Sequence, residues 1–154
     1  YEISACLVGS EMCIRDRDIA LDWSVAYSTE ERIDEINILQ ATQEAMHKAL
    51  DDLNIKPGFL LIDGNYFKPY KDIQCNCVVG GDDSYYSIAA ASILAKTARD
   101  RYIDELCKKE PGLDEKYGIK TNRGYGASKH IEGIKKYGIS EWHRKTFGIC
   151  KQFS

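Results

Sequence analysis

The sequence of 154 residues has no apolar run long enough to cross a bilayer, which takes about 18 consecutive apolar residues. It also lacks an excess of positive charge, because 21 lysines and arginines stand against 24 aspartates and glutamates, a net charge of −3. The charge of the whole chain therefore argues against attraction to a membrane surface or to nucleic acid. Any anion has to be bound by a local patch, and no membrane partner is expected.

Cysteine occurs six times, but in no spacing typical of a structural zinc site. One residue separates Cys75 from Cys77, and neither a second pair nor a nearby histidine completes four ligands. A secreted disulfide scaffold is usually shorter and lacks helical patterning. We therefore expect reduced thiols and a cytoplasmic protein, and the length predicts a single domain.

Residues 1–17, YEISACLVGSEMCIRDR, contain no basic segment followed by a cleavage site of small residues, so they predict no signal peptide. The string CLVGSEMCIRDR resembles translated sequencing adapter. We therefore expect residues 1–17 to be a non-native leader. The alternative is an ordinary N-terminal strand and loop.

From Asp18 onward, strand and helix patterns alternate, which predicts an α/β fold. A capping box beginning at Ser28 is expected to open the first helix, and glycine and polar residues predict a loop over 111–126. Apolar alternation predicts strands over 19–27, 59–63 and 73–79. Helical periodicity predicts helices from Ser28 to about Leu53, over 87–109 and over 128–137, with a partial helix in the tail.

Two of the predicted strands end in carboxylates. Asp63 follows the apolar run FLLI, and Asp82 and Asp83 follow CVVGG. Ligand and metal sites in α/β sheets lie beyond the C-terminal ends of the strands. Carboxylates brought together there repel each other unless a cation lies between them, and oxygen ligands suit Mg²⁺ or Mn²⁺. The alternative is that each aspartate only caps a turn or the following helix.

Three polar side chains share one face of the predicted helix over 87–109, because Ser92, Lys96 and Arg99 lie at i, i+4 and i+7. A hydroxyl and two cations near an acidic metal site can hold phosphate oxygens, and Arg99 can make a bidentate contact. The alternative is a solvated face on a surface helix.

Tyr125 lies between two glycines in the segment TNRGYG. An aromatic ring beside basic residues can stack on a sugar or a base while the cations hold the backbone. The alternative is a tyrosine that fills the core, since the chain has ten tyrosines.

None of the three histidines is predicted to act as a general base. His47 is expected to lie on a solvated helix surface, and His143 belongs to the tail segment HRKTF, where structural and substrate-contact roles both stay open.

Five segments together resemble the type 2 ribonucleases H in order and spacing: IDEINILQAT, LLIDGN, GGDDSYYSIAAASILAKTARD, RGYGASKH and HRKTF. The resemblance covers about Asp18 to Phe147. It implies an RNase H-like fold and a monomeric endonuclease. Such an enzyme cuts the RNA strand of RNA–DNA hybrids and incises duplex DNA on the 5′ side of a single ribonucleotide. It further implies a site of four carboxylates that binds two Mg²⁺ or Mn²⁺ ions.

Residue by residue, the resemblance implies that Asp63 and Asp82 are two of these catalytic, metal-binding carboxylates, with Asp83 in a neighbouring position that is not a ligand. Ser92, Lys96 and Arg99 would then position phosphates, and Tyr125 would pack on the deoxyribose that follows the ribonucleotide.

The family's Asp-Glu-Ala-Gly-Arg-Gly motif, which carries the other two carboxylates, has no counterpart before Asp18. We therefore expect an incomplete RNase H-like fold, with a partial catalytic domain over 18–150 and a tail over 151–154. The chain alone is expected to be inactive. The alternatives are a non-catalytic module that binds RNA–DNA hybrids and an unfolded fragment.

Overall fold

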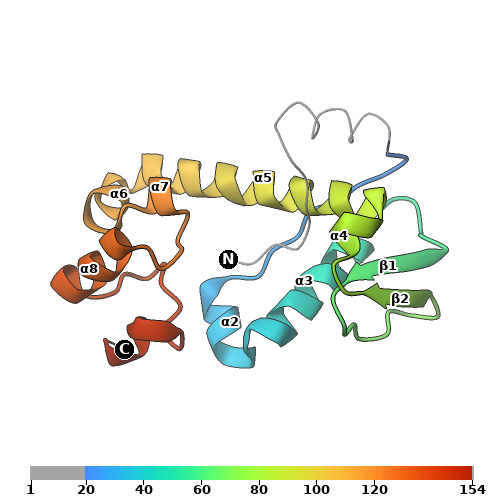
Figure 1. Ribbon diagram of the computed structural model, residues 1–154, viewed down its shortest axis with the longest axis horizontal. Coiled ribbons are helices and arrows are strands. Elements are labelled where there is room, and N and C mark those ends of the chain that lie inside the picture. Colours follow the sequence, from blue (N-terminus) through green and yellow to red (C-terminus); the bar gives the residue numbers. More distant parts are fainter. Residues whose placement is uncertain (1–19, 154) are drawn as a thin grey trace.

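The computed structural model describes residues 20–153, and the prediction for residues 1–17 falls outside this range (Figure 1). The described chain is rich in helices and contains one small sheet. Its elements are α2 (Glu30–Ile36), α3 (Ile38–Asp51), β1 (Phe59–Asp63), β2 (Gln74–Val78), α4 (Gly81–Ser84), α5 (Tyr86–Lys109), α6 (Pro111–Tyr117), α7 (Ile119–Asn122), α8 (Ser128–Tyr137) and the 3₁₀ helix η1 (Gly148–Gln152). Among these helices none is long and apolar enough to cross a membrane.

The sheet consists of β1 and β2, which pair in parallel with Phe59 opposite Gln74 and Asp63 opposite Val78. Both strands were predicted, and they form because their apolar residues pack against α3. Leu60 and Ile62 are buried with Phe67 and Tyr70, and Met46 and Leu50 of α3 cover this cluster. The C-terminal ends of the two strands therefore lie side by side, as a parallel sheet requires.

Helix α5 connects the two ends of the molecule (Figure 1). It is 24 residues long and was predicted within one residue of its observed start. Its N-terminal part contacts α4 and β1, and its C-terminal part contacts α6 and α7. Leu106 lies in a second apolar cluster with Leu113, Tyr117, Ile134 and Cys150.

The strand predicted over 19–27 is wrong for the part that the structure describes, because residues 22–29 form no regular secondary structure. The segment runs between two helices: the Ser24 hydroxyl donates to the Ala49 carbonyl of α3, and Val25 packs against Ile93 and Leu94 of α5. Val25 is thus covered by a helix, whereas Leu21, Trp23 and Tyr27 stay largely exposed, and no described strand pairs with the segment.

The single helix predicted from Ser28 to Leu53 is also wrong, because the chain breaks at Asn37. This residue has φ 68°, a region that asparagine tolerates better than most residues, and its side chain caps α3 by accepting from the Gln40 amide at 3.2 Å. The first cap is Thr29 instead of Ser28, and it accepts from the Arg32 amide.

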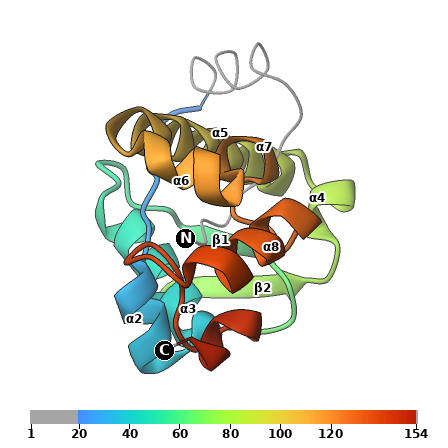
Figure 2. The same ribbon diagram turned by 90° about the vertical axis from the view of Figure 1, so that its left-hand side faces the viewer.

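The loop predicted over 111–126 contains α6 and α7 instead. Pro111 opens α6 at a position where its missing N–H costs nothing. Gly118, with φ 65°, separates the two helices. The prediction for α8 is confirmed, including Gly138 just after its last residue. Figure 2 shows the C-terminal segment lying beside α2, and Asp34 of α2 accepts hydrogen bonds from the amides of Lys145 and Thr146.

Candidate active site

The two residues predicted as carboxylate ligands lie at or just beyond the C-terminal ends of the parallel strands. Asp63 is the last residue of β1, and the chain leaves β2 to enter α4 at Gly81, directly before Asp82. The Gly81 amide donates to Asp63 Oδ1 at 3.0 Å, which holds the start of α4 against the end of β1. We call Asp63, Gly81 and Asp82 the carboxylate edge. Both carboxylates are exposed there.

Glycine at position 81 leaves room for the Ile88 side chain beside this edge. A Cβ atom there would lie 2.6 Å from Ile88 Cδ1 and 3.5 Å from Asp63 Oδ1. A larger residue would therefore have to displace the end of the Ile88 side chain of α5, whereas its distance to Asp63 would be an ordinary van der Waals contact. The hydrogen bond from Gly81 to Asp63 places the backbone of Asp82 next to the end of β1.

The donor chemistry of the carboxylate edge suits a hard divalent cation, since both side chains offer oxygen. The described residues nevertheless contain no group of three or more histidine, cysteine, aspartate or glutamate side chains placed to hold a metal. Two carboxylates alone could supply only part of an oxygen shell, and a cation held by them would take its other ligands from water.

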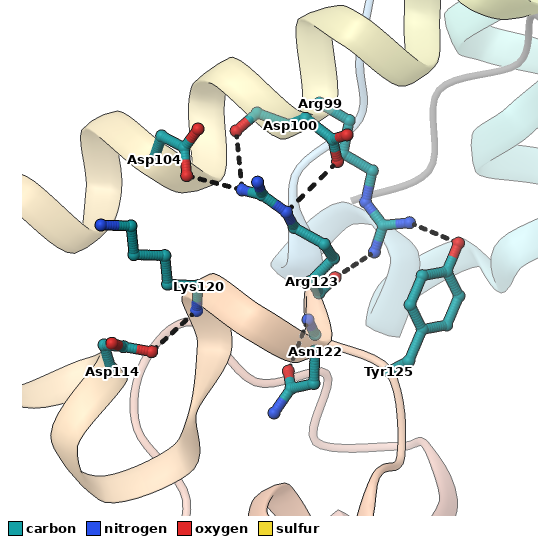
Figure 3. A network of polar contacts seen from close by, with 9 residues as sticks. Arg99, Asp100, Asp104, Asp114, Lys120, Asn122, Arg123 and Tyr125 are labelled. Atoms are coloured by element: carbon teal, nitrogen blue, oxygen red, sulfur yellow. Dashed lines mark hydrogen bonds and ion pairs between the residues drawn. The ribbon is translucent and has the colours of Figure 1, made fainter. Parts of the chain in front are cut away.

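The three polar residues predicted on one face of α5 differ in their surroundings. Lys96 is exposed and Ser92 is partly buried, whereas Arg99 turns toward the loop of residues 123–127, here called the Tyr125 loop. Arg99 Nη1 donates to the Tyr125 hydroxyl at 3.2 Å and Nη2 to the Arg123 carbonyl at 3.1 Å (Figure 3). Two residues that were predicted separately, Arg99 and Tyr125, are thus in direct contact.

Tyr125 does not fill the core, so the alternative reading of this residue is wrong. Its side chain is 65% exposed, and the Arg99 guanidinium lies 5.0 Å from the centre of its ring. The ring is therefore held by a cation on one side and remains accessible to a ligand.

Arg123 anchors the Tyr125 loop to α5 and was not singled out in the sequence. Its Nη1 donates to Asp104 Oδ1 at 2.6 Å and to the Asp100 carbonyl at 3.2 Å (Figure 3). The hydrogen bond with Asp104 raises the pKa of Arg123. The sequence feature that could have pointed to Arg123 is a pair of acidic residues four positions apart on α5, Asp100 and Asp104, together with a basic residue in a glycine-rich loop.

Two buried histidines support the same loop from below. His130 Nδ1 lies 2.8 Å from the Tyr125 carbonyl, and His130 Nε2 lies 3.1 Å from His143 Nε2. Burial, followed by the proximity of His130, lowers the pKa of His143 to about 4. The structural role left open for His143 is thus observed. His47, expected to be solvated, is instead partly buried and bonded to the Lys68 carbonyl at 3.1 Å.

A cavity of about 390 Å³ lies under the Tyr125 loop. Arg99, Tyr125, His130 and His143 contribute to its mostly apolar wall. Neither Asp63 nor Asp82 lines it, so this cavity is separate from the carboxylate edge.

The family model described as Ribonuclease HII matches residues 2–150. The chain belongs to the ribonuclease HII family. It is 52% identical over 130 residues to Ribonuclease HII of Phocaeicola vulgatus and 50% identical over 133 residues to that of Parabacteroides distasonis. These matches cover 84% and 86% of this chain, and 63% and 65% of the two relatives. The chain therefore spans a little under two thirds of their length.

The fold is similar to that of the ribonuclease H2 from Pyrococcus horikoshii OT3, with a TM-score of 0.73 and 24% sequence identity. The match covers 93% of this chain and 73% of the archaeal structure. The predicted RNase H-like fold, present in part, is thus confirmed. The resemblance drawn from five short segments is confirmed at the level of the family.

Proposed function

We propose that the chain carries part of the active site of an endonuclease. This enzyme cleaves the RNA strand of RNA–DNA hybrids and incises duplex DNA on the 5′ side of a single ribonucleotide. Membership of the ribonuclease HII family supports the reaction class. The observation that carries the proposal is the 3.0 Å hydrogen bond from Gly81 to Asp63, because it brings Asp82 to the strand end that Asp63 occupies.

In this proposal Asp63 and Asp82 are the catalytic carboxylates and hold Mg²⁺ or Mn²⁺. Two such cations, when bound, activate a water and stabilise the leaving oxygen of a phosphodiester. The water oxygen bonds to phosphorus, the bond from phosphorus to the 3′ oxygen breaks, and that oxygen takes up a proton. The products are a 3′-hydroxyl and a 5′-phosphate. Exposure of both carboxylates leaves room for a nucleic-acid backbone.

The remaining site residues position the substrate. Lys96 and Ser92 are proposed to contact phosphates, which orients the duplex without reading its sequence. The exposed ring of Tyr125 is proposed to pack on the deoxyribose that follows the ribonucleotide. Arg99 contributes positive charge and holds the Tyr125 hydroxyl. The net charge of −3 makes such a local patch necessary, because the chain as a whole does not attract phosphate.

We further propose that this chain alone does not cleave, because its described residues bring no third carboxylate to the edge. The test is incision of a duplex with one ribonucleotide in Mg²⁺ or Mn²⁺. The chain is assayed alone and after fusion behind the N-terminal segment of a full-length ribonuclease HII. Activity is expected only from the fusion, and Asp63→Asn should abolish it. Asp83→Asn is the matched control and should remain active, while cleavage by the unfused chain would contradict the proposal.

A second candidate function is a hybrid-binding module without catalysis, favoured by the exposed and anchored Tyr125. It requires binding to an RNA–DNA hybrid in EDTA, measured by fluorescence anisotropy. Lys96→Ala should weaken this binding, whereas Lys109→Ala at the far end of α5 should not. If binding disappears when the metal is removed, this candidate is wrong.

A further inference from the structure

A continuous chain of hydrogen bonds links the C-terminal segment to the Tyr125 carbonyl. The Ser140 amide donates to His143 Nδ1 at 3.0 Å, and the Ser140 hydroxyl lies 2.7 Å from the same atom. His143 Nε2 lies 3.1 Å from His130 Nε2, and His130 Nδ1 lies 2.8 Å from the Tyr125 oxygen. Both rings are only 7% exposed, so water cannot substitute easily for a lost partner.

The groups at the two ends of this series of hydrogen bonds determine which ring nitrogens carry protons. An amide can only donate, so His143 Nδ1 carries no proton, and a neutral His143 carries its proton on Nε2. That proton points to His130 Nε2, which must accept it. The proton of His130 therefore lies on Nδ1 and is donated to the Tyr125 carbonyl. One pair of neutral tautomers satisfies every contact.

The Tyr125 loop needs such support because its side chains are largely exposed and its backbone is irregular. Arg123 and Gly124 both have positive φ, 53° and 79°. Packing therefore contributes little to the loop, and hydrogen bonds determine where it lies. Arg99 holds the hydroxyl end of Tyr125, and His130 holds its main-chain carbonyl.

We propose that His130 and His143 are positioning residues, which act through the Tyr125 carbonyl to set the ring for a deoxyribose at an RNA–DNA junction. This inference rests on the proposed function of Tyr125. Neither histidine touches the substrate or moves a proton in the reaction. Their role is to hold one main-chain oxygen, and they do so only as a neutral pair.

Protonation of His130 would place a second N–H in the 3.1 Å gap between the two Nε2 atoms, and protonation of His143 would place an N–H on Nδ1, against the amide N–H of Ser140. The lowered pKa of His143 agrees with a His143 ring that is neutral near pH 7. Other polar groups around the pair come from each neighbouring element: Glu30 of α2, Arg99 of α5, Tyr117 of α6, and Ser140 and Arg144 of the C-terminal segment.

The first test reads the tautomers directly and needs no activity. Long-range ¹H–¹⁵N spectra of the whole chain at pH 7 should show the proton of His143 on Nε2 and that of His130 on Nδ1. The reverse assignment, or rapid averaging between tautomers in either ring, would overturn the proposed arrangement even if the enzyme assignment is correct.

The second test asks whether the pair acts through Tyr125. His130→Ala removes the donor to the Tyr125 carbonyl, whereas His130→Asn places an amide N–H near the position of Nδ1. Binding to a duplex with one ribonucleotide, measured in Ca²⁺, should weaken about five-fold in His130→Ala, the usual effect of one lost hydrogen bond. His130→Asn should recover most of the lost affinity. The NMR chemical shifts of Tyr125 should change more in His130→Ala than in His130→Asn.

A double-mutant cycle separates positioning from a general loss of structure. In a Tyr125→Ala background, His130→Ala should have no further effect on binding. An equal loss in both backgrounds would overturn the proposal. His47→Ala is the matched control, because His47 is also a partly buried ring bonded to a main-chain carbonyl. It should lower stability without changing binding.

If neither the unchanged protein nor any variant binds the duplex, the proposed function is wrong. The tautomers and the chemical shifts of Tyr125 then still test whether His130 and His143 position Tyr125. Unchanged Tyr125 shifts in His130→Ala would overturn that role.

Discussion

The two parts of the candidate site, the carboxylate edge and the Tyr125 loop, are built in different ways. At the edge, exposed carboxylates follow strand ends, and the Gly81 amide holds Asp63 in place. Tyr125 is held at its hydroxyl by Arg99 and at its carbonyl by His130, and Arg123 ties the loop to Asp104. The ring proposed to contact substrate is therefore held in place before any ligand binds, while the two carboxylates are exposed to solvent.

This contrast predicts where substitutions will change stability and where they will change only chemistry. Residues under the Tyr125 loop should affect the free energy of unfolding strongly. The two carboxylates of the edge should affect it little, because substitutions of exposed side chains usually change stability little.

The largest effect is expected from Gly133→Ala in α8. The added Cβ would lie 2.2 Å from the Lys116 carbonyl oxygen and 2.9 Å from Tyr117 Cδ1, so α8 must move away from α6. We expect a loss of about 3 kcal/mol in urea unfolding followed by circular dichroism. Gly112→Ala is the matched control, since its Cβ would meet nothing within 4 Å. Similar losses in both variants would contradict the packing described for α8.

The next effect concerns pH and His143. Its pKa is lowered from 6.5 to about 4 by burial and by His130, so between these values the unfolded chain binds a proton that the folded chain does not. The contribution of His143 to the free energy of unfolding is therefore complete above pH 6.5. It decreases as the pH falls toward 4, by about 3 kcal/mol at most.

Unfolding by urea across this pH range measures the loss. His143→Gln keeps a side-chain donor toward His130 but does not titrate, so its stability should depend less on pH. An unchanged pH dependence in this variant would show that another group is responsible.

A smaller effect is expected from Arg123→Ala, which removes the contacts with Asp100 and Asp104. These groups are partly exposed, so the loss should be about 1 kcal/mol. Limited proteolysis should nevertheless detect faster cleavage within the Tyr125 loop. Arg101→Ala, which changes an exposed arginine of α5, should leave the loop resistant. Equal protection in both variants would show that Arg123 does not anchor the loop.

The smallest effect on stability is expected at the carboxylate edge. Asp63→Asn keeps one oxygen that can accept from Gly81, so the free energy of unfolding should change by less than about 0.5 kcal/mol. Thermal unfolding without metal compares it with Asp83→Asn. A loss as large as that of Gly133→Ala would mean that Asp63 is a structural residue.

Much of the regular structure could be predicted because local patterns determine it. The strand over 59–63 and the helix over 128–137 carry their own apolar pattern and end signals. The strand over 19–27 could not be judged this way, because alternation does not show whether a neighbouring strand is present: Val25 packs against α5, and Leu21 and Tyr27 stay largely exposed. The break at Asn37 depends on one backbone angle that periodicity does not detect.

The site was predictable to a similar extent. Asp63 and Asp82 follow strand ends, and parallel pairing brings such ends together, so their proximity could be inferred. The link between His130 and His143 could not, because it depends on how the C-terminal segment packs under α8. The contact of Arg99 with Tyr125 was hidden for the same reason, since the two residues lie on different elements.

Paramagnetic broadening by Mn²⁺ tests the central claim most directly, namely that the carboxylate edge is the cation site of this chain. In a titration of ¹⁵N-labelled protein, the amides of Asp63, Gly64, Gly81 and Asp82 should broaden first, and Asp63→Asn should remove this effect. The acidic residues of α5 and α6, such as Asp104 and Asp114, already accept hydrogen bonds from Arg123 and the Lys120 amide. First broadening at those residues, with the edge unaffected, would contradict the account.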